Sequence, residues 1–574
     1  MRFLYAIAIL IASLLLFIAS LVIRNFFSAP DTLTQTISIN GDAPVTVIDA
    51  KELRRIANTE TIAVSTEPNA ASPVTIAWGR TPDVKAWIGS ASYQLLTVTK
   101  KSGEITESVV SGIEPSVPDP RGSDLWVQEW DGNADVSAEL ALRKGNSIVI
   151  VSDGTAPAPR SITIIWNLEV DRTIPTILLY LAGTSGLAGL GFLAVALWKE
   201  RRQRRHRQGR MPKSPKPPRW RPSRGGPLDR FKPKGRRGRR FAGFIAGGLL
   251  IPVVLAGCSS DATPQQTPTP VATGDLPYVA VTSEQFDRIL ESITTTLADA
   301  DSKRAENLAG TRLSDAALRF RGATYRVKSI SKKLGSLFTI PNGTVSLLLP
   351  QQTETWPRSV FAIVDDPKNP DAASVALVMT QEGPRSNFLV SYTFALEPGV
   401  VMPEVPSAEY GTAVLPGDTE LLSSTPEQIA KQYGDLLLNG DASAYASLFD
   451  TDTLQQQIGA GAKATRSDAM AGKARFSWTE SMAEDPPVVF ATTDAGALVA
   501  LTITEAETVR PAKDGAAIST EGAVRALSGR SSSMRGITAN YQYQLLLYVP
   551  AIGSASKARL LGYSYALVSA QEIR

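Results

Sequence analysis

The hydrophobic residues of the chain are concentrated in three uncharged segments, residues 3–23, 174–198 and 241–257. The first has 21 residues, which cover about 31 Å as a helix, close to the roughly 30 Å hydrocarbon core of a bilayer. It has no polar face, which argues against a surface helix of a soluble domain. Because Arg24 and Asn25 follow it in place of a small-residue cleavage site, the pattern favours an uncleaved anchor over a cleaved signal sequence.

The second segment is rich in small residues at a regular spacing. Ala182 and Gly186 are four residues apart, as are Ser185 and Gly189. Such a face lets two helix backbones approach closely in lipid. The alternative is that glycine is simply more frequent in membrane helices. Either interpretation predicts a transmembrane helix over residues 173–198.

Residues 28–172 have the pattern of a β-domain. Short runs of β-branched and aromatic residues alternate with Gly, Pro, Asn and Asp. In one run Ile162, Ile164 and Trp166 alternate with residues that face the other way. Seven strands and one helix are expected: strands at 32–39, 74–78, 92–99, 124–130, 137–142, 147–152 and 161–170, and the helix at 50–57. This number of short strands predicts an all-β sandwich or a jelly-roll-like domain.

Five of the nine tryptophans of the chain lie in this region. They are Trp78, Trp87, Trp126, Trp130 and Trp166. Exposed tryptophans could stack on sugar rings, but packing in a core is their commoner role, and we expect it here.

Residues 278–574 have helical patterns followed by strand patterns, which predicts an α+β architecture. In the second half, Thr425 is a helix N-cap with Glu427 in the first turn. A break at residues 439–441 ends this helix, and a second helix is expected to begin in 444–449. Four strands are expected in the rest of this half: 488–493, 497–505, 541–549 and 558–570.

Short matches in the same order indicate an internal repeat. Residues 282–286 (TSEQF) parallel residues 425–429 (TPEQI), and 360–362 (VFA) parallel 489–491 (VFA). The offsets drift from 143 to 129 while the order is kept. This predicts two copies of one α+β domain, at 278–416 and 417–574.

Charge is segregated along the chain. Residues 199–240 have 19 Lys and Arg and two Asp and Glu, whereas the rest has 40 basic and 53 acidic residues. This stretch is too charged and too rich in Pro and Gly to pack a core, so we predict a disordered loop. The excess of positive charge predicts that it is cytoplasmic, which places 28–173 and 259–574 on the extracytoplasmic side. Contacts with anionic lipids are expected; nucleic acid is not an expected partner.

The third hydrophobic segment has the anatomy of an export signal. Five residues dominated by arginine precede it, and Leu255-Ala256-Gly257-Cys258 follows its apolar core. These four residues resemble the lipobox of bacterial lipoproteins, with residues 259–277 as a flexible tether. The resemblance implies a lipid on Cys258 and cleavage just before it. The internal position is unlike that family, and the alternative is a plain third membrane helix over 241–258.

The sequence NGDASAYASLFD at 439–450 is similar to the opening of NTF2-like domains. The resemblance implies a curved sheet wrapped around helices, and it covers about a quarter of each predicted repeat. In that superfamily the sheet and helices enclose a cone-shaped space, which is a catalytic pocket in some members and a binding cavity in others.

The composition excludes several kinds of site. His206, the only histidine, lies among arginines, and Cys258 is the only cysteine. Mechanisms that need a histidine base, a histidine metal cluster, a disulfide or a cysteine-based zinc site are therefore excluded from the folded parts. We expect no catalytic residue, no metal and no cofactor; the one modification site expected is lipidation of Cys258.

Weak catalytic motifs have simpler explanations. Residues 329–332 and 554–557 match S-x-x-K, but no partner motif follows and a strand or loop is expected there. Asp299/Asp301 and Asp450/Asp452 match D-x-D, which helix breaks and N-caps explain. The adjacent carboxylates at 365–366 and 484–485 would point to opposite faces of a strand.

The sequence predicts a multi-domain membrane protein in eight parts. They are an anchor (1–27), a β-sandwich-like domain (28–172), a transmembrane helix (173–198), a basic loop (199–240), a third transmembrane or signal-like segment (241–258), a tether (259–277) and two α+β repeats (278–416 and 417–574). The leading hypothesis is a non-enzymatic protein of a bacterial cell envelope that binds a protein, a polysaccharide or a hydrophobic ligand. The alternatives are a carboxylate-based cell-wall enzyme and an accessory subunit of an export or assembly complex.

Overall fold

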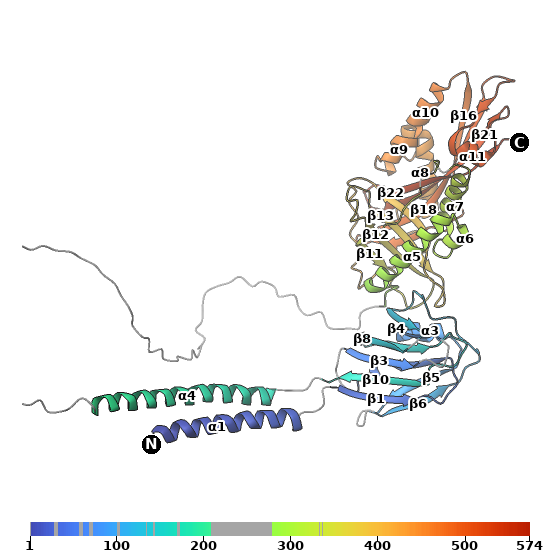
Figure 1. The fold of residues 1–574 in the computed structure, drawn as a ribbon. Coiled ribbons are helices and arrows are strands. Elements are labelled where there is room, and N and C mark those ends of the chain that lie inside the picture. The colour runs from blue at the N-terminus through green and yellow to red at the C-terminus, as the bar shows by residue number, and fades with distance from the viewer. Residues whose placement is uncertain are drawn as a thin grey trace, which may run out of the picture. The chain divides into compact units, whose positions relative to one another are not determined.

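The computed structural model has a mixed α/β architecture with large β-sheets and two long apolar helices (Figure 1). It describes residues 2–27, 32–56, 61–67, 73–99, 104–133, 135–141, 144–168, 173–207, 278–331, 333–335 and 337–574. By its contacts the chain divides into two compact units. One unit contains the two apolar helices; the other, here called the main body, contains residues 30–169 and 275–574.

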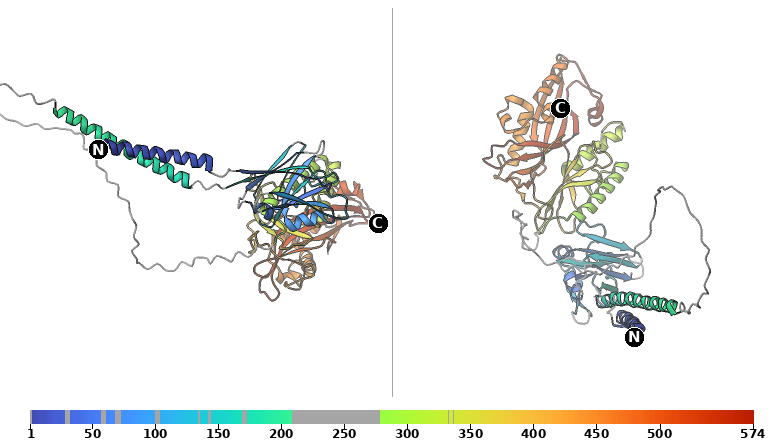
Figure 2. Two further views of the ribbon diagram at one scale, coloured as in Figure 1. Left: turned by 90° about the horizontal axis from the view of Figure 1, so that it is seen from below. Right: turned by 90° about the vertical axis from the view of Figure 1, so that its left-hand side faces the viewer.

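The two apolar helices form an antiparallel pair, which Figures 1 and 2 show side by side. The first is α1 (Arg2–Val22), extended by a π-turn (Ile23–Phe27), and the second is α4 (Thr173–Arg207). Ser13 Oγ donates to the carbonyl of Ala182 at 2.7 Å, and Ser20 Oγ donates to that of Pro175 at 2.8 Å. By length and composition both helices could cross a membrane.

Glycine allows the close approach of the pair. A Cβ on Gly189 would lie 2.9 Å from the side chain of Leu10, and one on Gly186 would lie 2.9 Å from Ser13 Oγ. The small-residue spacing thus marks the face of α4 that contacts α1.

The N-terminal part of the main body, here called the β-domain (residues 32–168), contains two sheets. The smaller is antiparallel, in the order β1 (Thr32–Ser38), β10 (Ser161–Asn167), β3 (Thr61–Glu67), β8 (Val136–Ala141). The larger has the order β6 (Ile105–Val110), β5 (Tyr93–Val98), β2 (Val45–Asp49), β9 (Asn146–Val151), β4 (Val74–Arg80), β7 (Gln128–Gly132). Within it β2 and β5 are parallel, and the short helices α2 (Ala50–Leu53) and α3 (Thr81–Ile88) follow β2 and β4.

The two sheets share one core. The inward residues of β10, Ile162, Ile164 and Trp166, are fully buried with residues of the larger sheet such as Ile148 and Ile150. The period-two pattern of this strand is therefore confirmed. Burial is also the fate of four of the five tryptophans, whose exposed fractions are at most 5%: Trp78, Trp87, Trp126 and Trp166.

The remaining part of the main body, here called the C-terminal domain (residues 278–574), is organised around a single ten-stranded sheet. Its order is β11 (Thr344–Pro350), β12 (Arg358–Asp365), β13 (Val375–Gln381), β14 (Leu389–Leu396), β22 (Arg559–Glu572), β21 (Ile537–Val549), β18 (Ala497–Pro511), β17 (Val488–Ala491), β15 (Val414–Leu415), with β16 (Ala474–Met482) also paired to β18. A two-stranded ribbon, β19 (Ile518–Ser519) with β20 (Ser532–Ser533), lies apart. The helices are α5 (Ser283–Lys303), α6 (Glu306–Ala309), α7 (Asp315–Ile330), α8 (Pro426–Asn439), α9 (Thr453–Ile458), α10 (Ala460–Ala469) and α11 (Gly522–Ser528).

Each half of the C-terminal domain opens with a helix that starts in the same way. The side chains of Thr282 and Thr425 each accept a hydrogen bond from the backbone N–H of the glutamine three residues later. The Oε1 atom of that glutamine accepts a hydrogen bond from the backbone N–H of the threonine. These capping boxes satisfy two otherwise unpaired backbone groups at each start.

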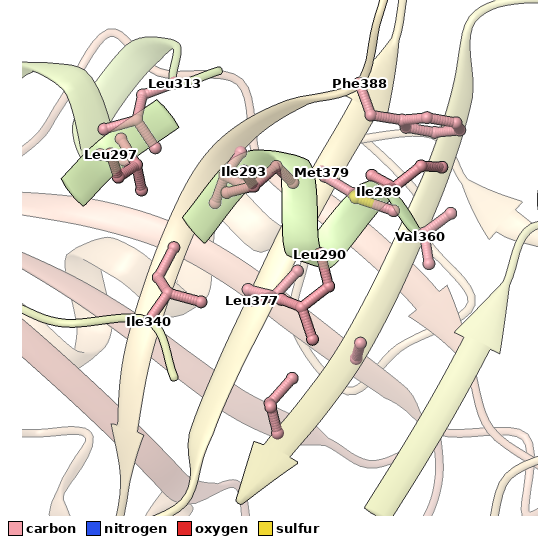
Figure 3. Close-up of a cluster of buried hydrophobic side chains, with 14 of the residues drawn as sticks. Ile289, Leu290, Ile293, Leu297, Leu313, Ile340, Val360, Leu377, Met379 and Phe388 are labelled. Atoms are coloured by element: carbon pink, nitrogen blue, oxygen red, sulfur yellow. The ribbon is translucent and has the colours of Figure 1, made fainter. Parts of the chain in front are cut away.

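The two halves are joined by pairing and by packing. Strand β14 of the first half pairs with β22 of the second, and the rings of Phe361 and Phe490 lie 6.0 Å apart in a shared core. A separate core lies under α5, where Ile289, Leu290 and Ile293 face the sheet (Figure 3). The two repeats and the jelly-roll connectivity remain predictions.

Several expected elements differ from the structure. The strand expected at 124–130 begins only at Gln128, because residues 124–126 form contacts with the C-terminal domain instead. The helix expected to begin in 444–449 is one 3-10 turn (Ala446–Leu448). Strands β2, β3 and β6 and helix α3 were not expected from the sequence.

Buried ion pairs join the β-domain to the C-terminal domain. Asp124 binds Arg312 at 2.6 Å, and the two side chains are 0% and 6% exposed. Asp83 binds Arg358 at 2.8 Å, with side chains 3% and 2% exposed. Burial lowers the pKa of the Arg358 guanidinium, although Asp83 acts against this shift.

Backbone groups complete the contact. Gln285 Nε2 donates to the carbonyl of Leu125 at 3.0 Å, and the Asp124 amide donates to Asn387 Oδ1 at 3.0 Å. At the edge, Arg385 pairs with Glu114 and donates to the carbonyls of the α3 C-terminus. Because desolvated charges need all their partners, this contact tolerates little relative displacement of the two domains.

Removing one member of a buried pair tests this contact. Arg312→Met leaves Asp124 as a buried carboxylate without its cation, which typically costs about 3–5 kcal/mol. The matched control is Arg160→Met, which breaks the exposed pair with Asp42 and should cost less than about 1 kcal/mol. We expect thermal unfolding of the full chain to shift clearly downward for the first variant only. Equal shifts would contradict the contact.

Candidate functional site

A cavity of about 300 Å³ lies in the second half of the C-terminal domain. Four of its lining residues are aromatic: Trp478, Tyr541, Tyr543 and Tyr565. Four are charged: Lys463, Arg466, Glu505 and Glu507. The others come from α9 and the start of α10: Leu454, Gln457, Ile458 and Ala462. The lining therefore combines aromatic walls with two acids and two bases.

The strand register brings these side chains to one face of the sheet. Glu480 of β16 lies opposite Glu505 of β18, and Trp478 lies opposite Glu507. On the other side of β18, Glu505 lies opposite Tyr541 of β21. Because side chains two residues apart on a strand share a face, alternate positions of three strands converge here.

Lys463 of α10 is the cation at the base of the cavity. Its Nζ lies 2.5 Å from Glu505 Oε2 and 3.6 Å from Glu480 Oε1, and the three side chains are at most 8% exposed. It also donates to the carbonyls of Ile458 at 2.7 Å and Leu437 at 3.3 Å. One ammonium thus binds two carboxyls and satisfies carbonyls near the ends of two helices.

Glu480 is held in its neutral form. Burial, together with the neighbouring Glu505, raises the pKa of Glu480 to about 10, against the opposing effect of Lys463. Glu480 is therefore protonated at neutral pH and leaves one negative charge for Lys463 to balance. The cluster of Lys463, Glu480 and Glu505 at the bottom of the cavity therefore carries no net charge.

The rim of the cavity has a second balanced pair. Arg466 binds both carboxylate oxygens of Glu507, and Trp478 Nε1 donates to Glu507 Oε2 at 3.2 Å. The rings of Tyr543 and Tyr565 stack at 5.7 Å, and Tyr565 is 61% exposed. The arrangement can hydrogen-bond a polar ligand and pack against a ring.

One aspartate of each D-x-D match, Asp301 and Asp452, forms hydrogen bonds that stabilise the fold. Asp452 caps α9 through the Gln455 amide and accepts a hydrogen bond from Tyr433, as expected for an N-cap. Asp301 was expected at a helix break or cap, but it lies within α5, where it accepts from Arg321 and Tyr325.

The other motifs also lie apart from the cavity lining. Asp365 is the last residue of β12. Asp485 lies in the loop after β16, where it is buried and forms an ion pair with Arg319 of α7. Ser329 lies in the last turn of α7, not in the expected strand or loop, whereas residues 554–557 lie in the expected loop. Cys258, the predicted lipidation site, lies outside the described residues.

Lys463, Glu480 and Glu505 were not expected from the sequence to form a site. The alternation of residues in 476–482 and 503–507 could have indicated the site, because it places glutamate on the more buried face of each strand. The pairing that brings the two runs together was not available from the pattern alone. Among the described residues, no group of three or more His, Cys, Asp or Glu is arranged to hold a metal ion.

Comparison with family models assigns the C-terminal domain. Residues 277–572 match the model of DUF8094, a domain of unknown function, over more than half of the chain. The chain belongs to the DUF8094 family. The match spans both halves of the ten-stranded sheet, which agrees with their shared core. Searches of curated proteins and of solved structures found no match.

The buried acid pair of this DUF8094 domain should give a distinctive pH dependence. Unfolding lets Glu480 ionise above pH about 4.3, whereas the folded chain keeps its proton up to about pH 10. The folded state therefore holds more protons in this window, and stability falls as pH rises, by at most about 1.4 kcal/mol per unit.

Glu480→Gln removes this titration. We expect the variant to gain stability relative to wild type as pH rises from about 5 to 10. The exposed Glu521→Gln should keep the wild-type profile. The measurement is denaturant unfolding at a series of pH values. Parallel profiles for wild type and Glu480→Gln would show that Glu480 is not held protonated.

Proposed function

We propose that the chain is a membrane-anchored protein of a bacterial cell envelope. In this proposal the β-domain and the DUF8094 domain lie together on the extracytoplasmic side, where they bind a ligand. The observation that carries the proposal is the buried contact between two domains separated along the chain by an apolar helix and a basic loop.

The helix pair supports the first step. The end of α1 lies beside the start of α4, since Ser20 of one contacts Pro175 of the other. If both helices cross the bilayer, residues 32–168 connect their ends on one side. The chain that continues beyond α4 then begins on the opposite side. The 19 basic residues in 199–240 indicate that this opposite side is the cytoplasm.

The contact between the domains supports the second step. Arg312 and Arg358 of the C-terminal domain bind aspartates of the β-domain, so both domains need to be on the same side. The chain must therefore recross the membrane between residues 207 and 278. The sequence offers one segment for this, residues 241–257, which is uncharged and apolar.

The recrossing segment is proposed either as a third transmembrane helix or as a lipoprotein signal that ends in a lipidated Cys258. Both alternatives leave residues 278–574 outside. Cleavage before Cys258 would leave the two domains held only by their non-covalent contact. An immunoblot with tags at both ends of the chain distinguishes them: two products mean cleavage, and one full-length band means a third helix.

Binding is the activity that the cavity supports best, because its charges are already paired and its walls are aromatic. The carboxylate-based enzyme remains a separate hypothesis. It predicts that replacing Asp365, Asp366, Asp450 and Asp452 together abolishes cell-wall hydrolysis. The hypothesis of an accessory subunit predicts copurification of a complex in mild detergent.

Lysine labelling in intact cells tests the topology. A membrane-impermeant amine reagent should modify Lys303 and Lys431, whose side chains are 62% and 67% exposed. It should spare the five lysines of residues 199–240: Lys199, Lys213, Lys216, Lys232 and Lys234. Permeabilised cells are the control, in which both groups should react. Labelling of the loop lysines in intact cells would overturn the proposed orientation.

A further inference from the structure

We propose that the cavity of the DUF8094 domain binds an uncharged saccharide unit. This inference rests on the proposed function, because it names the ligand class that an extracytoplasmic binding domain would take. It depends on the balance of charge in the cavity, on the geometry of its aromatic walls and on its opening to solvent.

The charge balance argues against an ionic ligand. Each base in the cavity lining forms a direct ion pair with an acid, Lys463 with Glu505 and Arg466 with Glu507. A carboxylate or phosphate entering the cavity would compete with Glu505 and Glu507 for the same cations. An amine would compete in the same way with Lys463 and Arg466. A ligand without net charge avoids both costs.

The same polar groups argue against a purely apolar ligand. Burying paired charges under hydrocarbon would remove their remaining contact with water without new hydrogen bonds. Hydroxyl groups both donate and accept, so they suit a lining of alternating acids and bases.

The aromatic walls specify a ring. Tyr541 and Tyr565 belong to the neighbouring strands β21 and β22, and Trp478 belongs to β16, which β18 separates from β21. Tyr565 stacks on the buried Tyr543. Flat faces of this kind pack against the C–H face of a sugar ring, which is apolar although its edges are hydroxylated. A volume of about 300 Å³ lies at the small end of ligand cavities and suits one or two such rings.

The cavity is accessible from solvent at Tyr565, which is 61% exposed. A ring held there could be one unit of a longer chain that continues outside. The predicted location outside the membrane would put such polymers within reach. The proposed ligand is therefore a sugar unit of an envelope polysaccharide.

The test uses the full chain in an amphipol, since sugar-headed detergents would occupy the cavity. Saturation-transfer NMR is recorded with four probes at equal concentration: glucose, N-acetylglucosamine, choline and laurate. We expect transfer to a sugar ring and none to choline or laurate. A signal from choline or laurate alone, or from none of the four, would overturn the proposal.

Two variants connect the signal to the cavity. Tyr565→Ala removes the exposed ring and should weaken sugar binding about tenfold. Tyr445→Ala, which removes a 39% exposed tyrosine that is not part of the cavity lining, should leave binding unchanged. Equal binding by all three proteins would place the sugar elsewhere and contradict the assignment.

Failure of the sugar-binding test can be distinguished from failure of the proposed membrane topology. If lysine labelling places residues 278–574 outside and no sugar binds, only the ligand assignment fails. If sugar binds but labelling shows the opposite membrane orientation, the ligand assigned to the cavity is supported and the envelope function is wrong.

Discussion

Two arginine–aspartate pairs constrain the whole arrangement of the main body. Asp124–Arg312 and Asp83–Arg358 are almost fully withdrawn from water, although residues far apart in the chain contribute them. Charges in such surroundings are stable only with their partners in place. The β-domain and the DUF8094 domain therefore behave as one body, and the membrane topology has to accommodate that.

The same principle operates in the cavity, with a different result. Lys463 lies against two buried glutamates, of which Glu480 has a raised pKa, and Arg466 is matched by Glu507. Between the domains, paired charges form a closed contact. In the cavity the paired charges line an open space with aromatic walls.

The parts of the fold that were predictable depend on local sequence. The alternation in β10 and the Thr425 helix start are set by neighbouring residues, and both were predicted. Residues 124–126 could not be predicted, because a distant domain determines their conformation. Glu480 and Glu505 likewise meet only through the pairing of β16 with β18, so the raised pKa of Glu480 cannot be inferred from either strand alone.

Cross-linking in native membranes tests most directly whether the two domains contact each other on one side. Glu114 and Arg385, which form an ion pair at 2.6 Å at the edge of the contact, are each replaced by cysteine and treated with a short bis-maleimide. A cross-link between the two domains is expected in the double variant, detected as a mobility shift, and none in either single variant, both of which retain Cys258. A double variant that reacts at both cysteines without forming the cross-link would show that the two domains do not contact each other.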